Sequence, residues 1–177
     1  MPRLNVVDPQ RAEGKARELF EGPLKGKHFN IFKGLANSPA ALEAYLALSG
    51  ALQNTQLTAK EREYIALATA EANDCRYCLA AHTALGKMAG LSDAEMLAAR
   101  RGDGTDPRLT ALGRFVRALH EKKGFVSDAD LAAVRAAGYT DGHIAEITAV
   151  YALNVFTNLF NHVNDTAIDF PGAPPLK

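Results

Sequence analysis

Signals that begin an α-helix recur from one end of the chain to the other, whereas signals for β-strands are nearly absent. Each helix-start signal is a Ser, Thr or Asp whose side-chain oxygen can accept a hydrogen bond from the first backbone N–H groups of a helix. Several of these residues are followed by proline or by a capping glutamate. They stand at Asp8, Ser38, Thr58, Asp74, Ser92, Asp106, Ser127 and Thr140. The chain is therefore predicted to be all-α, a bundle of about eight helices.

Stop signals and apolar periodicity indicate where these helices end. The glycines Gly22, Gly26 and Gly34 predict an irregular connection after the first helix, and Asp74 is expected to cap a helix that begins at Cys75. The predicted helices cover residues 9–20, 40–53, 58–72, 75–89, 93–100, 107–123, 128–137 and 140–164. The last of them is apolar on more than one side, which predicts burial by several neighbours or at a subunit contact.

A chain of 177 residues is long enough to fill one hydrophobic core and short for two. It is therefore expected to form a single domain over residues 1–177. Within this domain we expect an N-terminal helix and irregular lead-in over 1–37, a core over 38–100, C-terminal helices over 106–165 and an irregular tail over 166–177.

Charge and composition exclude several classes of function. Twenty basic residues balance twenty acidic ones without a cluster of either sign, so neither a nucleic-acid surface nor a membrane surface is predicted. No apolar run approaches the roughly 20 residues of a membrane span, and no leader-peptide pattern is found at the N-terminus. These features predict a cytoplasmic protein, and in that reducing compartment two close cysteines more often bind metal or do redox chemistry than form a structural disulfide.

The two cysteines of the chain lie three residues apart and are followed by a histidine, in the stretch DCRYCLAAH. On a helix, Cys75, Cys78 and His82 fall within an arc of roughly 60°, so all three side chains can meet. Thiols in the first turn of a helix face unsatisfied backbone N–H groups, which favour the thiolate. The helix dipole favours ionisation of Cys75, but His82 lies one turn above Cys78 and can relay its proton. We therefore assign Cys78 as the attacking thiol and Cys75 as the resolving thiol.

A carboxylate that completes this relay is predicted on the preceding helix. If the two helices form an antiparallel hairpin about Asn73, positions equidistant from that break lie side by side. Glu63 and His82 are nearly equidistant from it, and Glu63 is in line with an apolar stripe of its own helix. Glu61, the other candidate, is assigned to the capping box that it forms with Thr58 at the start of the same helix.

Other interpretations of the cysteines compete with redox chemistry. A structural zinc site needs four ligands, and the fourth would have to come from His28, His120, His143 or His162. A c-type haem site needs a histidine directly after the second cysteine, where Leu79 stands, and a thioredoxin-like site needs flanking strands. The cysteines can also be inert small residues of the core. The pattern as a whole favours redox chemistry without metal, haem or flavin.

These residues resemble the AhpD-like alkylhydroperoxidase branch of the carboxymuconolactone decarboxylase superfamily. The family pattern is a glutamate, eleven intervening residues and then C-x-x-C-x-x-x-H, and Glu63, Cys75, Cys78 and His82 match each element. The resemblance is strongest over residues 40–100. The stretches ANSPAALEAYLALSGAL and ALNVFTNLFNHV resemble the peroxidase-related subgroup of that family.

The resemblance implies an all-helical protein that assembles as a homo-oligomer, a trimer or a hexamer, and that reduces organic hydroperoxides without a cofactor. It implies that Glu63 and His82 deprotonate Cys78, directly or through a water, that Cys78 becomes a sulfenic acid, and that Cys75 then closes a disulfide. An external reductant then reopens the disulfide; in well-known relatives it is a lipoyl-bearing protein, and a thiol or a lipoyl-type protein is expected for this chain.

One position departs from part of the family, because Tyr77 stands directly before the second cysteine, where some of these peroxidases carry a histidine. The decarboxylase members generally lack the cysteine pair, so lactone decarboxylation is not predicted as the main activity. The competing hypotheses are a disulfide oxidoreductase, a decarboxylase-like enzyme that uses the same pocket, and a non-catalytic zinc-binding or redox-sensing module.

Overall fold

The computed structural model describes residues 1–176, and every regular element within that range is helical, which confirms the predicted all-α class. The helices are α1 Gly14–Glu21, α2 Asn30–Leu35, α3 Pro39–Ala51, the short 3₁₀ helix η1 Leu52–Asn54, α4 Ala59–Ala72, α5 Arg76–Met88, α6 Asp93–Arg100, α7 Pro107–Glu121, α8 Asp128–Ala136 and α9 Asp141–Asn164. The predicted irregular tail contains no helix up to residue 176, and Lys177 lies outside the described residues.

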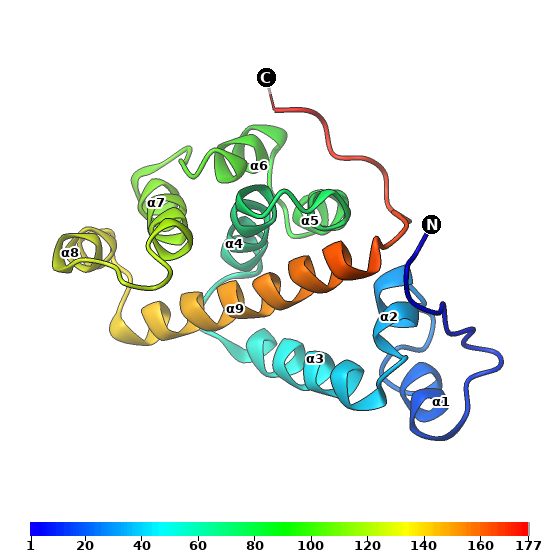
Figure 1. Ribbon diagram of the computed structural model, residues 1–177. Helices are drawn as coiled ribbons and strands as arrows, with labels where there is room; N and C mark the ends of the chain where they lie inside the picture. Colours follow the sequence, from blue (N-terminus) through cyan, green and yellow to red (C-terminus); the bar gives the residue numbers. More distant parts are fainter. Residues whose placement is uncertain (177) are drawn as a thin grey trace.

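Helix α4 is the centre of the arrangement (Figure 1). It packs against α5, α6, α7 and α9, and α9 runs across the molecule so that it also contacts α3 and α5. All residues from Tyr64 to Ala70 are buried. A helix that is covered on all sides needs apolar or small residues around its whole circumference, which explains the run YIALATA at these positions.

The buried apolar side chains form two clusters. The first joins α4 with α6, α7, α8 and the first half of α9, and includes Tyr64, Leu112 and Ile147. The second joins α1, α2 and the start of α3 with the start of α5, and it includes both Cys75 and Cys78. The cysteine segment is therefore part of the core, packed with the N-terminal helices.

Side-chain caps begin six helices where the sequence predicted them. In each case the capping oxygen accepts a hydrogen bond from the backbone N–H three residues later, which satisfies one of the donors that a helix start leaves unpaired. The caps are Ser38 for α3, Thr58 for α4, Ser92 for α6, Asp106 for α7, Ser127 for α8 and Thr140 for α9.

The helix predicted over residues 9–20 is wrong at its start. Asp8 closes only a turn, in which its Oδ1 accepts from the N–H of Gln10 at 2.9 Å and its carbonyl accepts from the N–H of Arg11 at 3.0 Å. Gly14 then adopts a φ of +51°, in the left-handed region, so a right-handed helix cannot continue through it from the preceding residues. Helix α1 therefore begins only at Gly14.

Helix α2 was not predicted, because its segment was assigned to an irregular connection. With α2 included, the described residues contain nine α-helices rather than about eight. A Cβ atom on Gly34 would lie 2.8 Å from Asn164 Nδ2 and 3.0 Å from Phe160, so glycine is what allows α2 to approach α9 this closely. In a sequence, a glycine that permits close packing looks the same as one that ends a helix.

The helix start predicted at Asp74 is displaced by one residue, because Asp74 ends α4. Asp74 adopts a φ of +51°, and its N–H donates to the carbonyl of Glu71 at 3.0 Å. The N–H of Cys75 donates to the carbonyl of Ala70 at 2.9 Å, and this pair of bonds closes a Schellman motif. Cys75 is therefore the N-cap of α5, and its Sγ accepts a hydrogen bond from the N–H of Cys78 at 3.3 Å.

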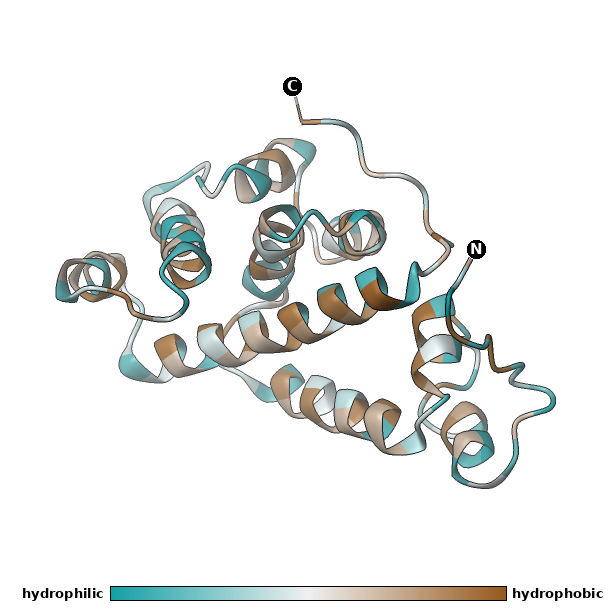
Figure 2. Cartoon of the chain, in the orientation of Figure 1, coloured by the Kyte–Doolittle hydropathy of each residue, from teal (hydrophilic) through white to brown (hydrophobic). Residues whose placement is uncertain are grey.

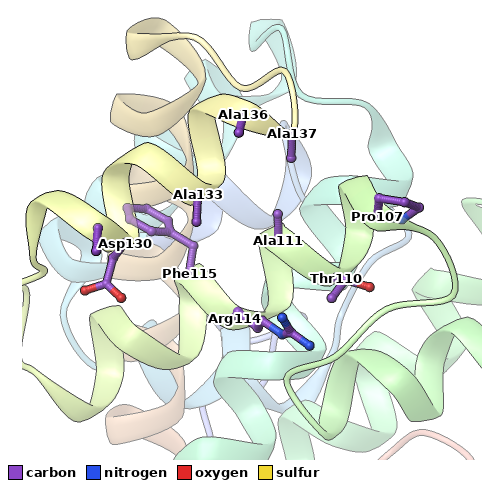
Figure 3. Close-up of a pocket in the computed structure, with 10 residues that line it drawn as sticks. Pro107, Thr110, Ala111, Arg114, Phe115, Asp130, Ala133, Ala136 and Ala137 are labelled. Atoms are coloured by element: carbon purple, nitrogen blue, oxygen red, sulfur yellow. The ribbon is translucent and has the colours of Figure 1, made fainter.

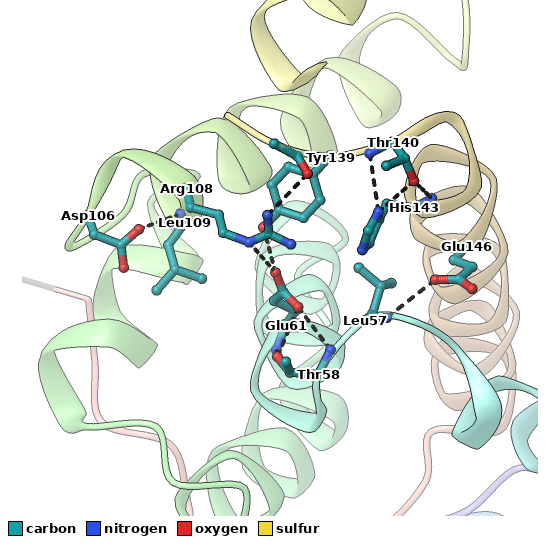
Figure 4. A network of polar contacts seen from close by, with 11 residues as sticks. Leu57, Thr58, Glu61, Asp106, Arg108, Leu109, Tyr139, Thr140, His143 and Glu146 are labelled. Carbon is teal, nitrogen blue, oxygen red and sulfur yellow. Dashed lines mark hydrogen bonds and ion pairs between the residues drawn. The ribbon is translucent and has the colours of Figure 1, made fainter. Parts of the chain in front are cut away.

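Glu61 caps α4 as predicted, and it also joins three segments of the chain (Figure 4). Its carboxylate accepts hydrogen bonds from the hydroxyls of Thr58 and Tyr139 and from Nε of Arg108, each at 2.9 Å. Burial alone would raise the pKa of this carboxyl, but the hydrogen bonds outweigh burial and hold its pKa below the ordinary value. The stabilisation by Glu61 is therefore present above the pKa of the unfolded chain, and it is lost as the pH falls through the folded pKa.

Replacing Glu61 by glutamine is expected to lower the free energy of unfolding by about 2 kcal/mol at neutral pH, because a buried charge network loses its acceptor. Urea unfolding at several pH values measures this loss, which should shrink below about pH 4. Glu95→Gln is the matched control, since Glu95 forms the capping box of α6 without a buried tyrosine partner, and it should cost about 0.5 kcal/mol. Equal losses in the two variants would show that the network adds nothing to the cap.

Candidate active site

The hairpin of α4 and α5 brings Glu63 and His82 into contact, as its geometry predicted. Glu63 Oε2 lies 2.8 Å from His82 Nδ1, and the two side chains are 21% and 20% exposed. An ionised carboxylate can only accept a hydrogen bond, so Nδ1 is the donor, and in the neutral imidazole Nε2 then carries the free lone pair. The pair therefore has the arrangement of a histidine base oriented by a carboxylate.

Cys75 and Cys78 are joined by a disulfide, and their Cα atoms are 5.3 Å apart. They occupy the N-cap and the third residue of α5. His82 follows Cys78 by four residues on the same helix, which places the two on one face, one turn apart. The four residues singled out in the sequence are thus all carried by one helical hairpin, with the Schellman turn at its tip.

Neither cysteine is open to solvent in this disulfide form, since Cys75 is 1% exposed and Cys78 is 3% exposed. On one side, Asn161 of α9 donates from Nδ2 to Cys78 Sγ at 3.3 Å. A folded protein cannot place its own cysteine against sulfurs as buried as these without a conformational change. A reactant that reaches them directly has to be small or slender.

A cavity of about 670 Å³ lies beside the Glu63–His82 pair, and both residues form part of its wall. The wall also includes residues of α3, of α9 and of the segment 23–29. Most of the lining is apolar or aromatic, including Phe29, Phe32, Tyr45, Leu46, Leu52, Leu85, Val150 and Leu153. Two of the lining residues lie about one helical turn from residues at the disulfide: His82 follows Cys78 by four residues on α5, and Thr157 precedes Asn161 by four residues on α9.

A second cavity, of about 520 Å³, lies between α7 and α8 (Figure 3). It is lined mainly by alanines together with Phe115, Arg114 and Asp130. Asp130 is already bound to Ser127 and Lys122, and Arg114 lies 3.9 Å from Asp103. Because no cysteine or histidine lines this cavity, it lacks the nucleophile and base that the first cavity adjoins.

The polar inward face of α9 was missed by the sequence interpretation, which noted only that this helix is apolar on more than one side. Asn154, Asn158 and Asn161 are 5%, 0% and 4% exposed. Asn158 Oδ1 accepts a hydrogen bond from Asn73 Nδ2 at 2.9 Å, which ties α9 to the tip of the hairpin. Their spacing of four and three residues is the signal that would have placed them together on one helix face.

Within residues 1–176, no group of three or more His, Cys, Asp or Glu side chains is arranged to hold a metal ion. Two histidines considered as distant zinc ligands have other contacts in the structure. His143 Nδ1 lies 2.7 Å from the Thr140 hydroxyl, and His120 Nδ1 lies 3.3 Å from the Tyr151 hydroxyl. In the same part of the chain, no helix combines the length and the apolar character needed to cross a bilayer.

Comparison with known proteins identifies one family and several similar structures. Residues 39–121 match the carboxymuconolactone decarboxylase family, and no curated protein matches the chain. An uncharacterized peroxidase-related protein from Ralstonia eutropha JMP134, described as an alkylhydroperoxidase AhpD core, is 25% identical with a TM-score of 0.84, over 95% of this chain and 92% of that one. A peroxidase-related protein from Silicibacter sp. TM1040 is 24% identical with a TM-score of 0.79, over 93% and 89% of the two chains.

The debrominase Bmp8, in complex with 2,3,4-tribromopyrrole, is also similar in structure. It is 18% identical to this chain with a TM-score of 0.77, and the match covers 96% of this chain and 94% of that one. At this identity the likeness shows a shared fold. Since one fold can support several reactions, the chemistry has to be argued from the site.

Proposed function

Because the chain belongs to the superfamily of the carboxymuconolactone decarboxylases and AhpD-like alkylhydroperoxidases, we propose that it is a dithiol peroxidase that reduces organic hydroperoxides. The observation that carries this proposal is the Glu63–His82 hydrogen bond, one helical turn from the Cys75–Cys78 disulfide. A disulfide alone suits a structural link between two residues. A structural link does not need an oriented histidine base in the wall of the adjoining cavity.

In the proposed cycle, Cys78 of the reduced protein gives its proton to His82 Nε2, and Glu63 stabilises the imidazolium that forms. The thiolate attacks one oxygen of the hydroperoxide and the O–O bond breaks. The alkoxide that leaves takes the proton back from His82, and Cys78 becomes a sulfenic acid. The Cys75 thiol then attacks the sulfenic sulfur, which releases water and forms the disulfide. One hydroperoxide is thus reduced to an alcohol and water while two thiols are oxidised.

The cavity supports an organic hydroperoxide rather than hydrogen peroxide as the substrate. Its apolar and aromatic lining gains free energy from covering an organic group, which hydrogen peroxide lacks. The buried sulfurs also argue against a general disulfide oxidoreductase, whose protein substrates are too large to reach them. We propose an external thiol or a lipoyl-type arm as reductant, since either is slender enough to enter. The need to reopen the disulfide favours the reducing cytoplasm.

Thiol counting combined with mass spectrometry tests this function on the full chain. The reduced protein should lose both thiols on addition of one equivalent of cumene hydroperoxide and release one equivalent of the alcohol. Its mass should fall by two hydrogen atoms, because Cys75 and Cys78 become a disulfide. Two thiols that persist in excess hydroperoxide would contradict the proposal, and stoichiometric zinc in the purified protein would replace it with a structural metal site.

We further propose that the chain forms a homo-oligomer, a trimer or a hexamer, through the outer face of α9. Figure 2 shows hydrophobic residues along this helix, and Phe156, Leu159 and Val163 are 38%, 53% and 61% exposed. Apolar side chains of this size on the outside of a long helix are typical of a subunit contact. Leu159→Glu is expected to lower the molecular mass measured by light scattering. A wild-type protein that is monomeric at micromolar concentration would contradict this assembly.

A further inference from the structure

Helix α9 is unusual in the side chains that it turns toward the core. Its buried residues in the second half are all polar, whereas no large apolar residue of the same stretch is buried and Phe156, Leu159 and Val163 are exposed. The buried set is Asn154, Thr157, Asn158, Asn161 and Asn164. Burying an amide costs free energy unless its polar atoms find partners, so a row of asparagines at this place requires an explanation beyond packing.

Asn161 contacts the sulfur that the proposed cycle makes the nucleophile. Its Nδ2 donates to Cys78 Sγ at 3.3 Å, and its side chain lies in the core, with the residue 4% exposed. Asn161 Oδ1 and the neighbouring Asn158 Nδ2 have no hydrogen-bond partner among the described residues. A leucine would pack at position 161 without an unpaired acceptor. The presence of an asparagine at position 161 is therefore explained better by the hydrogen bond that it donates to Cys78 Sγ than by a contribution to the stability of the fold.

We infer that Asn161 binds the Cys78 thiolate of the reduced protein and so selects Cys78, rather than Cys75, as the nucleophile; this rests on the proposed function. The sulfur of a disulfide or of a thiol is a weak acceptor, whereas a thiolate carries a full charge. An amide N–H that donates to a charged acceptor forms a stronger bond than one that donates to a neutral acceptor. Because Asn161 is already in place in the buried site, it stabilises the thiolate without having to reorganise.

Cys78 has to be selected as the nucleophile because the N-terminus of α5 favours ionisation of the other cysteine, Cys75. Cys75 is the N-cap of α5, where its Sγ accepts the N–H of Cys78 and lies at the positive end of the helix dipole. Without a donor of its own, Cys78 would be the less acidic thiol. Asn161 gives Cys78 an equivalent hydrogen bond from a different helix.

The ionisable groups around Cys78 act in addition to this amide. His82 is on the same helix and Glu63 is on α4, whereas the buried residues in the second half of α9 are asparagines and a threonine. Tyr77 accepts the N–H of Ile31 through its hydroxyl, and burial raises its pKa, so it stays neutral. Burial likewise raises the pKa of Tyr45 on α3. Asp169 of the C-terminal segment accepts the N–H of Asn30. Asn161 is thus an uncharged donor whose effect does not depend on the protonation of a neighbour.

Titration of the Cys78 thiol tests this inference directly. In a Cys75→Ser background the ultraviolet absorbance of the thiolate is followed against pH, and the signal of a protein without cysteines is subtracted. Asn161→Leu should move the midpoint upward by about one pH unit, which is a tenfold loss of thiolate at neutral pH. Asn161→Asp, which has nearly the same shape, should also move it upward, because an acceptor replaces the donor.

Asn154→Leu is the matched control, since Asn154 is equally buried on the same face but donates to the carbonyl of Val150 rather than to sulfur. Its midpoint should equal that of the Cys75→Ser parent. An unchanged midpoint in folded Asn161→Leu would overturn the inference, and where that variant does not fold, an unchanged midpoint in Asn161→Asp would do so. If the midpoint moves as expected while the wild-type protein reduces no hydroperoxide, the thiolate site stands and the proposed function fails.

Discussion

Cys78→Ser is expected to lower the rate of hydroperoxide reduction by about a thousandfold or more, to the level of the uncatalysed reaction. A serine hydroxyl stays protonated at neutral pH and cannot be oxidised to the equivalent of a sulfenic acid. The variant can therefore neither attack the hydroperoxide nor form the oxidised intermediate. Steady turnover of cumene hydroperoxide with an excess of a small dithiol measures this rate. Circular dichroism verifies that the helices persist.

Cys75→Ser provides the matched comparison, because it removes the other sulfur of the same disulfide. This variant should react once with hydroperoxide and then hold Cys78 as a sulfenic acid, since no thiol is left within the protein to condense with it. The adduct is detected by mass spectrometry after trapping with dimedone. If Cys75→Ser fails in this first reaction while Cys78→Ser retains it, the nucleophile is Cys75 and the roles are exchanged.

Glu63→Gln is expected to slow hydroperoxide reduction by about a hundredfold, with little change in stability. Glutamine has the shape of glutamate and its oxygen can still accept the His82 Nδ1 hydrogen bond, so the geometry is retained while the charge that stabilises the imidazolium is lost. The measurement is the rate of Cys78 oxidation as a function of pH in a single turnover. The rising limb of this pH–rate profile should move to higher pH in the variant, because the Cys78 thiolate forms less readily.

Glu71→Gln is the control for this substitution. Glu71 is also a glutamate of α4 with a side chain that is partly buried, but its carboxylate binds Arg100 of α6 at 2.6 Å instead of His82. The same change at this position should leave the rate and its pH profile as they are in the wild type. A Glu63→Gln profile that coincides with that of Glu71→Gln would remove Glu63 from the mechanism.

Most helix starts were predictable because the interactions that define them are local. A cap such as Thr58 or Thr140 satisfies backbone donors within three residues, so the signal and the structure that it causes lie in the same short segment. The contact of Glu63 with His82 was predictable for a related reason. Two helices joined by a tight turn must lie side by side, and the turn at Asn73 then determines which positions are level.

The errors fall where a local signal has two possible outcomes. Asp74 can cap the start of one helix or end the previous one, and the Schellman bonds of α4 decided for the end. Gly34 can break a helix or allow it to pack closely, and the position of α9 decided for packing. In both cases the interaction that decides the outcome involves residues outside the local sequence signal.

The sequence by itself determined the all-α class, six capped helix starts, and the placement of two cysteines, a histidine and a glutamate on one hairpin. Only the tertiary structure decided that the sulfurs are buried, that a largely apolar cavity adjoins the Glu63–His82 pair, and that α9 turns Asn161 toward Cys78. The physical reason is the range of the interactions. Helix caps and hairpins are settled between residues close in the chain, whereas the side of a helix that becomes buried depends on the free energy of packing against all the others.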